Sequence, residues 1–378
     1  MTAMPIGLYI HVPFCRTRCH FCAFYLRIYR DDLAQAYIQA LLKEICLHAF
    51  RLTTRNRPLS TVYLGGGTPT LLPPDALIQI LDVVRRELGV APDAEITIEG
   101  TPDSVTEDGL HALRAAGFTR LSLGLETSVP EELVAIGRRR ASDGIAARVG
   151  HARRAGFTNL NLDLIYGLPG QTERSWQASL DQALALNPTH VSTYALSVEA
   201  GSRFHVDTHR GDLTELDEAL ALRLDNMAVQ SLAAAGFERY EISNYARPGF
   251  SCRHNRLYWE AGDYLGLGPC AQSYVGEQRF SVMADLDRYR DLLARGALPI
   301  CDEQWLNPAQ RGKDALVFGL RLLAGVDIQH RATRDAVDAA EPVLSRLKAE
   351  GWLEQEGTRL RLTNLGRQYA DSVAVELL

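Results

Sequence analysis

Apolar and polar positions along the first half of the chain follow two alternating patterns. Short apolar runs, each bounded by glycine, proline or polar residues, predict six β-strands. These runs cover residues 7–12, 61–65, 95–99, 120–124, 159–165 and 190–196. Between them, apolar residues recur every three or four positions, as on one face of a helix. This second pattern predicts helices over 32–50, 74–88, 107–116, 142–155 and 173–186.

A strand followed by a helix, repeated at intervals of roughly 30–40 residues, is typical of a parallel sheet that curls into a barrel. Six such units are too few to close the barrel. We therefore predict an α/β fold whose core is an open (β/α)6 partial TIM barrel. In such barrels the chemistry lies at the carboxyl ends of the strands.

The alternation of strand and helix stops near residue 200. A helix is predicted over 212–235, and the last part of the chain has helices followed by two short strand patterns, 352–355 and 358–362. Accordingly, we divide the chain into a barrel core (1–200), an accessory α+β region (201–298) and a small C-terminal domain (299–378).

Composition and charge narrow the classes of function. Of the 378 residues, 46% are apolar, which is enough for a full core. The net charge of −6 gives no electrostatic footprint for nucleic acid or an anionic membrane. The first residues lack the basic segment and cleavage site of a signal peptide, and no apolar run reaches membrane-spanning length. We expect a cytoplasmic protein that neither binds nucleic acid nor spans a membrane.

Three of the seven cysteines, Cys15, Cys19 and Cys22, lie directly after the first predicted strand. Three thiolates at this spacing can hold three irons of a [4Fe–4S] cluster and leave the fourth iron open for chemistry. Zinc is the alternative, because His20 lies inside the same loop and could supply a fourth ligand.

The surroundings of this triplet resemble the radical S-adenosylmethionine (SAM) superfamily. Tyr9-x-His11-x-Pro13-Phe14 precedes the cysteines, and Phe21 stands before the last of them. Within the superfamily the chain is similar, nearly end to end, to the branch that contains oxygen-independent coproporphyrinogen III oxidase, the HemW heme chaperones and related methyltransferases. The resemblance implies a [4Fe–4S] cluster, bound SAM, an electron donor such as flavodoxin or ferredoxin, and a winged-helix-like cap at the C-terminus.

The same resemblance assigns SAM contacts to motifs at the ends of the predicted strands. The glycine-rich loop 64–70 would receive the methionyl amino group, and Glu99 would bind a ribose hydroxyl or the ammonium group. The resemblance also implies a site for a second SAM molecule, formed by Phe21, Gly67, Thr68, Glu126, Arg138 and Asp163. At one of these positions the branch usually has Gln, where this chain has Glu126. All implied SAM contacts are Tyr9, Phe21, Gly66, Gly67, Thr68, Glu99, Glu126, Arg138, Asp163, Ser197 and Gln272.

A further motif, His254-Asn255-x-x-Tyr258-Trp259, follows the predicted barrel. By resemblance it is associated with heme binding in the chaperones, which makes heme a candidate cofactor and His254 a candidate iron ligand. Structural packing is the alternative role for a His-Asn pair beside aromatic residues.

The chain also departs from the chaperone pattern at Cys270, at Gln272 and at Glu126. These departures favour a radical SAM methyltransferase, in which a second SAM provides a methyl-derived carbon for an sp2 carbon of a small-molecule substrate. Glu126, Cys270 and His254 are then the candidate bases. A heme chaperone that delivers heme to target proteins is the alternative. Coproporphyrinogen oxidation is disfavoured, because Phe24 stands where those oxidases have an additional cysteine.

Overall fold

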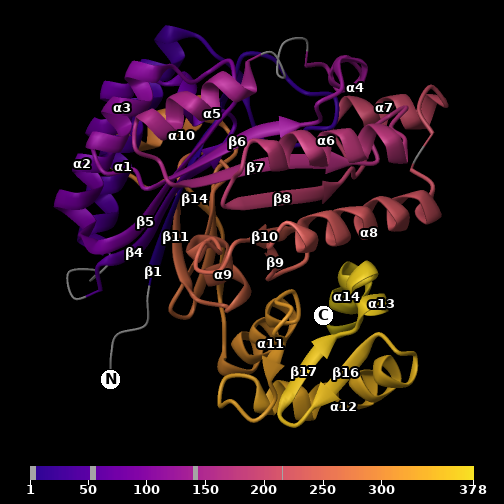
Figure 1. Cartoon of the computed structure of the whole chain (residues 1–378). Coiled ribbons are helices and arrows are strands. Elements are labelled where there is room, and N and C mark those ends of the chain that lie inside the picture. The colour runs from indigo at the N-terminus through magenta and orange to yellow at the C-terminus, as the bar shows by residue number, and fades with distance from the viewer. Residues whose placement is uncertain (1–5, 52–56, 139–143, 215) are drawn as a thin grey trace.

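The computed structural model describes residues 6–51, 57–138, 144–214 and 216–378. Its main element is a twelve-stranded sheet with a parallel centre and antiparallel edges (Figure 1). In spatial order the strands are β14 (Ile300–Trp305), β13 (Gln278–Val282), β12 (Gln272–Val275), β11 (Asp263–Leu267), β1 (Ile6–Val12), β4 (Leu59–Gly66), β5 (Val90–Gly100), β6 (Arg120–Glu126), β7 (Asn159–Tyr166), β8 (His190–Ala195), β10 (Asn244–Ala246) and β9 (Glu238–Arg239). The six strands from β1 to β8 are parallel and lie in chain order.

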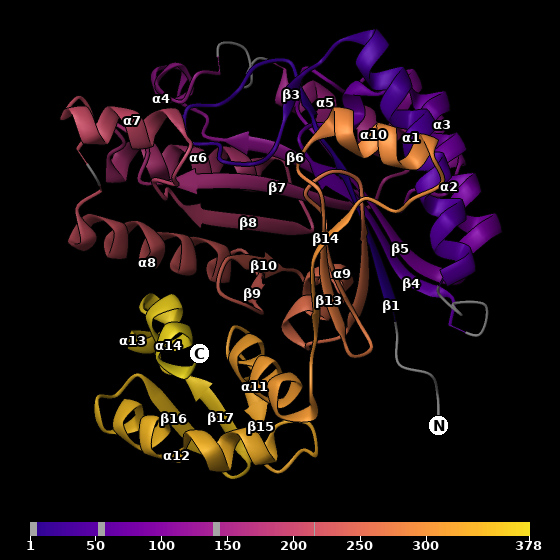
Figure 2. The same ribbon diagram turned by 180° about the vertical axis from the view of Figure 1, so that it is seen from behind.

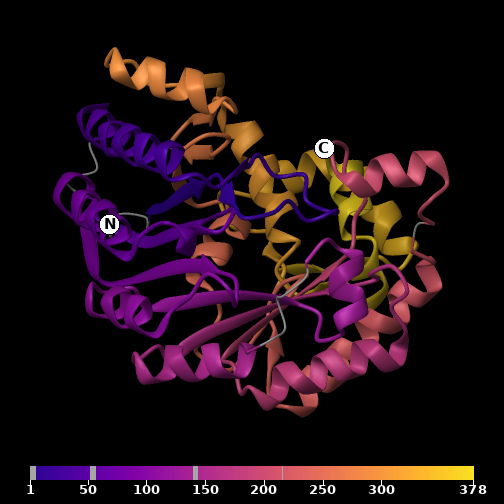
Figure 3. The ribbon, with the colours of Figure 1, turned by 90° about the horizontal axis from the view of Figure 1, so that it is seen from above.

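Helices between these strands cover the outer face of the curved sheet (Figures 1 and 2). They are α1 (Asp31–Arg51), α2 (Pro74–Leu88), α3 (Glu107–Ala115), α5 (Ile145–Arg154), α6 (Glu173–Ala185) and α8 (Glu218–Ala234). Two short helices, α4 (Pro130–Ala135) and α7 (Arg203–Arg210), lie instead near the carboxyl ends of the strands (Figure 1). Two later helices, α9 (Arg253–Trp259) and α10 (Leu286–Ala294), return to this body. Viewed from above in Figure 3, α10 (orange) lies beside α1 (indigo), so the segment after the barrel packs on its first helix.

Alternation along the strands separates an apolar outer face from a polar inner face. In β1, Leu8, Ile10 and Val12 belong to the large apolar core together with residues of the covering helices. On the inner face the parallel register brings polar side chains of neighbouring strands into contact. The hydroxyl of Tyr63 on β4, for example, donates a hydrogen bond to Glu99 on β5. The barrel therefore has a polar interior inside an apolar shell.

The C-terminal segment forms a smaller unit with a separate apolar core. Its sheet has the order β15 (Val326–Asp327), β17 (Arg359–Leu362), β16 (Leu353–Glu356). Its helices are α11 (Pro308–Gly319), α12 (Arg334–Ala349), α13 (Asn364–Gln368) and α14 (Ala370–Leu377). In Figures 1 and 2 this unit (yellow) lies below α8 and α9, and α11 contacts α9.

The predicted α/β class with a parallel, barrel-like sheet is confirmed, but the sheet is wider than predicted. β11 adds to β1 in parallel, although the two strands are far apart in the chain. The helix predicted over 212–235 begins only at Glu218, because Asp217 caps its N-terminus by accepting a hydrogen bond from the backbone of Leu220. The start of the helix predicted over 142–155 lies outside the described residues.

Two further findings concern the predicted domains and membrane spans. The accessory region contributes Leu224, Leu267 and Tyr289 to the same core as the barrel strands. The predicted division at residues 200 and 298 stays a prediction. Within the described ranges, every helix is too short or too polar to cross a membrane.

Candidate functional site

A cavity of about 610 Å³ opens at the carboxyl ends of the parallel strands. It extends from the cysteine loop after β1 into the polar interior of the barrel. Twelve residues predicted from the sequence line it: Cys15, Cys19, Phe21, Cys22, Gly66, Gly67, Thr68, Glu99, Glu126, Arg138, Asp163 and Ser197. The fold thus brings one set of motifs together from six separate strand ends.

The cysteine loop is held at the cavity by short secondary structure. Cys15 ends β2 (Phe14–Cys15), which pairs with β3 (Arg27–Ile28), and the backbone N–H of Cys22 donates to the carbonyl of Cys19. All three thiols are free and partly exposed. Burial raises the pKa of Cys15 to about 11, so this thiol keeps its proton at neutral pH until a metal replaces it.

The donor set around the triplet fits an iron–sulfur cluster better than zinc. The ring of His20 is directed away, since its Nδ1 contacts the carbonyl of Ala135 at 2.9 Å and the ring packs edge-on against Phe204. Among the described side chains, no three His, Cys, Asp or Glu residues converge on a single ion. A zinc site needs four ligands around one ion, whereas a [4Fe–4S] cluster takes one thiolate at each of three irons.

Arg138 links the cysteines to the end of β6. Its Nε donates to the sulfur of Cys19 at 3.2 Å, and its Nη1 forms an ion pair with Glu126 at 2.5 Å. Burial alone would lower the pKa of Arg138, but the Glu126 carboxylate raises it well above the ordinary value. The guanidinium of Arg138 therefore stays charged next to the sulfur. Glu126 itself adopts a positive φ of 56°, a conformation uncommon for a residue with a side chain.

The glycine-rich loop after β4 packs directly on the strand that leads into the cysteines. The backbone N–H groups of Gly67 and Thr68 donate to the carbonyls of Val12 and Phe14. A Cβ at Gly67 would lie 2.5 Å from the carbonyl oxygen of Phe14, so a side chain is excluded there. Glycine allows this close approach of two backbones. The loop lines the cavity with Gly66, Gly67 and Thr68.

Glu99 lies at the same level on β5, and burial raises its pKa to about 7. One carboxylate oxygen accepts from the hydroxyl of Tyr63 at 2.6 Å and the other from the backbone N–H of Gly66 at 3.1 Å. Both contacts orient the carboxylate at the cavity wall.

Four predicted site residues lie elsewhere: Tyr9, His254, Cys270 and Gln272 are not among the cavity-lining residues. Gln272 is exposed on β12, where its amide oxygen accepts from Ser281. His254 is 1% exposed, with Nδ1 2.8 Å from the Thr61 hydroxyl and Nε2 2.7 Å from the Tyr258 hydroxyl. Burial lowers the pKa of His254 to about 3. Because both ring nitrogens are engaged, His254 offers none to iron in this structure.

The structure also places in the cavity several residues that the sequence analysis did not select. They line its interior from β4, β6, β7 and β8: Tyr63, Arg120, Ser122, Asn161, Ser192 and Tyr194. The period of two along each strand could have found most of them. In β6, for example, Arg120 and Ser122 are two positions apart and therefore share a face of the strand, whereas Glu126 follows a shift in register after Gly124.

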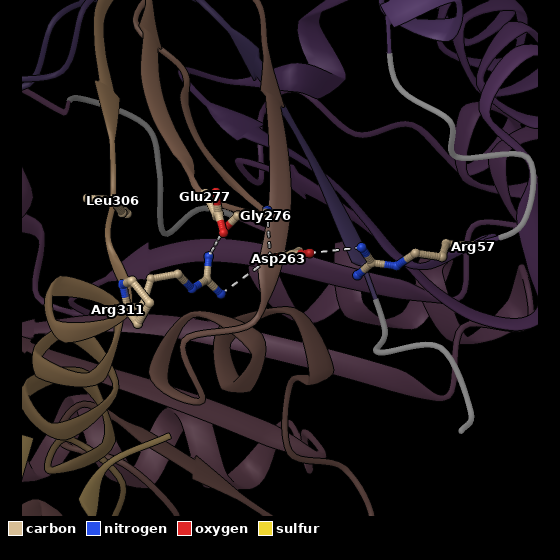
Figure 4. A pocket seen from close by; sticks show the side chains of 7 residues that line it. Arg57, Asp263, Gly276, Glu277, Leu306 and Arg311 are labelled. Carbon is tan, nitrogen blue, oxygen red and sulfur yellow. Dashed lines mark hydrogen bonds and ion pairs between the residues drawn. The ribbon is translucent and has the colours of Figure 1, made fainter. Parts of the chain in front are cut away.

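A second hollow of about 490 Å³ lies at the opposite end of the strands, where Asp263 begins β11 (Figure 4). Asp263 forms ion pairs with Arg57 at 2.9 Å and with Arg311 at 3.5 Å. Gly276 donates its backbone N–H to the same carboxylate. These charged groups are paired with one another, and none of the predicted site residues lies there.

An open parallel barrel with a cysteine triplet and a glycine-rich loop at its carboxyl end defines a radical SAM protein. In agreement, residues 9–183 match the Radical SAM superfamily model, and residues 306–369 match the HemN C-terminal domain. Heme chaperone HemW of Mycobacterium tuberculosis is 37% identical over the whole chain and 96% of its own length. Heme chaperone HemW of Bacillus subtilis is 31% identical over 97% of each chain. The protein belongs to the HemN/HemW-like branch of the radical SAM superfamily. Membership of this superfamily implies a [4Fe–4S] cluster and SAM as cofactors.

A solved structure supports the fold. Coproporphyrinogen III oxidase (HemN) from Escherichia coli, a radical SAM enzyme, matches with a TM-score of 0.86 and 25% identity, over 100% of this chain and 91% of that one. The relatives correct the predicted activity, however. The full-length relatives above are named heme chaperones, so the prediction of a methyltransferase from Glu126, Cys270 and Gln272 is wrong. The assignment of Glu126, Cys270 and His254 as methyl-transfer bases falls with it.

Proposed function

We propose that this protein is a heme chaperone of the HemW type, which binds heme and passes it to recipient proteins. The observation that carries the proposal is the 37% identity with Heme chaperone HemW of Mycobacterium tuberculosis over the entire chain. Similarity along all parts of the sequence supports a shared function more strongly than a shared barrel does, since one fold serves many functions.

The cavity supports bound SAM beside a cluster. When bound, a [4Fe–4S] cluster with SAM supplies one-electron chemistry at an open iron. Cys15, Cys19 and Cys22 would hold the cluster, and Arg138 would donate a hydrogen bond to the Cys19 thiolate. Glu99 and the glycine-rich loop would orient SAM against it. We expect the protein to act in the cytoplasm, with flavodoxin or ferredoxin as electron donor.

Heme itself does not fit at the residue that the motif suggests. His254 is buried and bonded through both ring nitrogens, and an aromatic cluster of Tyr9, Tyr63 and Tyr258 surrounds its ring. Its place in the structure is that of a packing residue, and we assign it no role in binding iron.

The test of the proposed function is anaerobic. The reconstituted protein is titrated with heme while the Soret absorbance is followed, and the loaded protein is then mixed with an apo-recipient such as apomyoglobin. We expect saturable binding near one heme per chain, followed by transfer, with no S-adenosylhomocysteine formed. Catalytic loss of carboxylates from coproporphyrinogen III, or absence of saturable heme binding, would contradict the proposal.

A further inference from the structure

A buried cation that has no hydrogen-bond partner among the described residues lines the inner part of the barrel cavity. Arg120 begins β6, is 1% exposed and lines the cavity. Its Nε and Nη1 are sealed from solvent, and no acceptor among the described residues is within hydrogen-bond distance of them.

Two carboxylates that interact electrostatically with this guanidinium, Glu95 and Glu99, and a third that lines the same cavity, Asp163, are already engaged by other donors. Glu95 accepts hydrogen bonds from two backbone N–H groups and one thiol at the start of α9. Glu99 accepts from a tyrosine hydroxyl and a backbone N–H. Asp163 accepts from a serine and an asparagine of β6 and β7. Acidic side chains therefore lie around Arg120, but within the described part of the chain none of them forms an ion pair or a hydrogen bond with it.

An unpaired charge in a protein interior costs free energy, because burial removes its hydration. Buried polar groups without partners are rare in folded proteins, and at a cavity they are candidates for binding a ligand. Arginine pairs with carboxylates through strong, charge-assisted hydrogen bonds. We propose that the inner end of the cavity is a carboxylate-binding subsite, in which Arg120 pairs with a carboxylate of the bound ligand.

Two ligands of the proposed function carry a suitable group. SAM has one carboxylate on its methionyl part, and heme has carboxylates on its two propionate side chains. Pairing of Arg120 with a heme propionate rests on the proposed function, whereas pairing with the SAM carboxylate rests only on membership of the family.

The experiment compares wild type, Arg120→Gln and Arg154→Gln in the full-length, anaerobically reconstituted protein. Arg154 is a matched control, because it is exposed on α5 and paired with Glu107 on the surface. Dissociation constants are measured for SAM, heme and heme dimethyl ester. We expect Arg120→Gln to weaken either SAM or heme roughly 10- to 100-fold, the range for a lost hydrogen bond between charged groups. Arg154→Gln should change neither.

Comparison of heme with heme dimethyl ester shows which ligand provides the carboxylate that pairs with Arg120. If the carboxylate is a propionate, heme dimethyl ester should bind wild type as weakly as heme binds Arg120→Gln, and SAM should be unaffected. If the carboxylate is that of SAM, only the affinity for SAM should fall. In either case Arg120→Lys, which keeps the charge, should recover part of the affinity.

A structural role for Arg120 makes a different prediction. Removal of an unpaired buried cation should leave the ligand-free protein at least as stable as wild type in urea, whereas a structural arginine would stabilise it. Failure of Arg120→Gln to fold, lower ligand-free stability, or unchanged affinity for both SAM and heme would overturn the proposal. Wild type that binds no heme, together with weaker SAM binding by the variant, would reject the chaperone function and keep the subsite.

Discussion

Acidification should destabilise this protein through His254 in a way that an accessible iron ligand would not produce. The folded-state pKa of His254 is lowered to about 3, while an unfolded histidine titrates near 6.5. Below pH 6.5, His254 therefore binds a proton in the unfolded chain but not in the folded chain, and the free energy of unfolding decreases as the pH falls toward 3. At pH 5 the loss is roughly 2 kcal/mol, from 1.5 pH units at about 1.36 kcal/mol each.

The assay is urea unfolding of wild type and His254→Gln at pH 7.5 and pH 5. Glutamine retains a donor and an acceptor but cannot titrate, so it removes only the pH-dependent part. We expect wild type to lose about 2 kcal/mol more than the variant between the two pH values, because every other titrating group is common to both proteins. An equal loss in both would refute the reasoning, since it would mean that His254 is accessible to protons in the folded state.

Three other predictions follow from single contacts. Glu44 is fully buried with a pKa raised to about 7, so wild-type stability should fall as pH rises from 4.5 to 7, and Glu44→Gln should be up to about 3 kcal/mol more stable than wild type at pH 8 in urea unfolding. An unchanged pH profile would contradict this. Arg138→Gln removes a donor to a cluster thiolate and leaves a buried carboxylate unpaired, so iron content after reconstitution and cluster lifetime should fall, while Arg154→Gln keeps both; equal lifetimes would rule out this role. Gly67→Ala places a Cβ against the backbone before the cysteines and should lower both stability, by roughly 2 kcal/mol or more, and cluster content, whereas Gly150→Ala in the middle of a helix should stabilise by up to about 1 kcal/mol.

The cluster and SAM motifs were predictable because they are local in sequence. Cys15, Cys19 and Cys22 lie in one loop, and the glycine-rich loop follows one strand. The carboxyl ends of parallel strands meet at one edge, so the strand pattern alone brings these motifs to one mouth. The structure agrees with this for Glu99 and the other residues that line the cavity.

The function, in contrast, could not be predicted from local motifs. Substitutions at Glu126, Cys270 and Gln272 suggested a change of chemistry, yet full-length relatives at 37% and 31% identity are named heme chaperones. Two of the three residues, Cys270 and Gln272, are absent from the cavity lining. A departure from a family pattern indicates new chemistry only when its side chain reaches the site, and sequence position alone does not reveal that.

By itself, the sequence determined the class of fold, the order of its parallel strands and the triplet that marks the site, because hydrophobic period and ligand spacing act over short distances. Tertiary structure alone decided that β11 would pair with β1 and that two hydroxyl groups would contact the ring nitrogens of His254. It also decided that Arg120 would have no hydrogen-bond partner among the residues that the structure describes. Those outcomes depend on contacts between residues far apart in the chain. Burial and pairing are properties of such contacts, so the same histidine or arginine has a different role in a different surrounding.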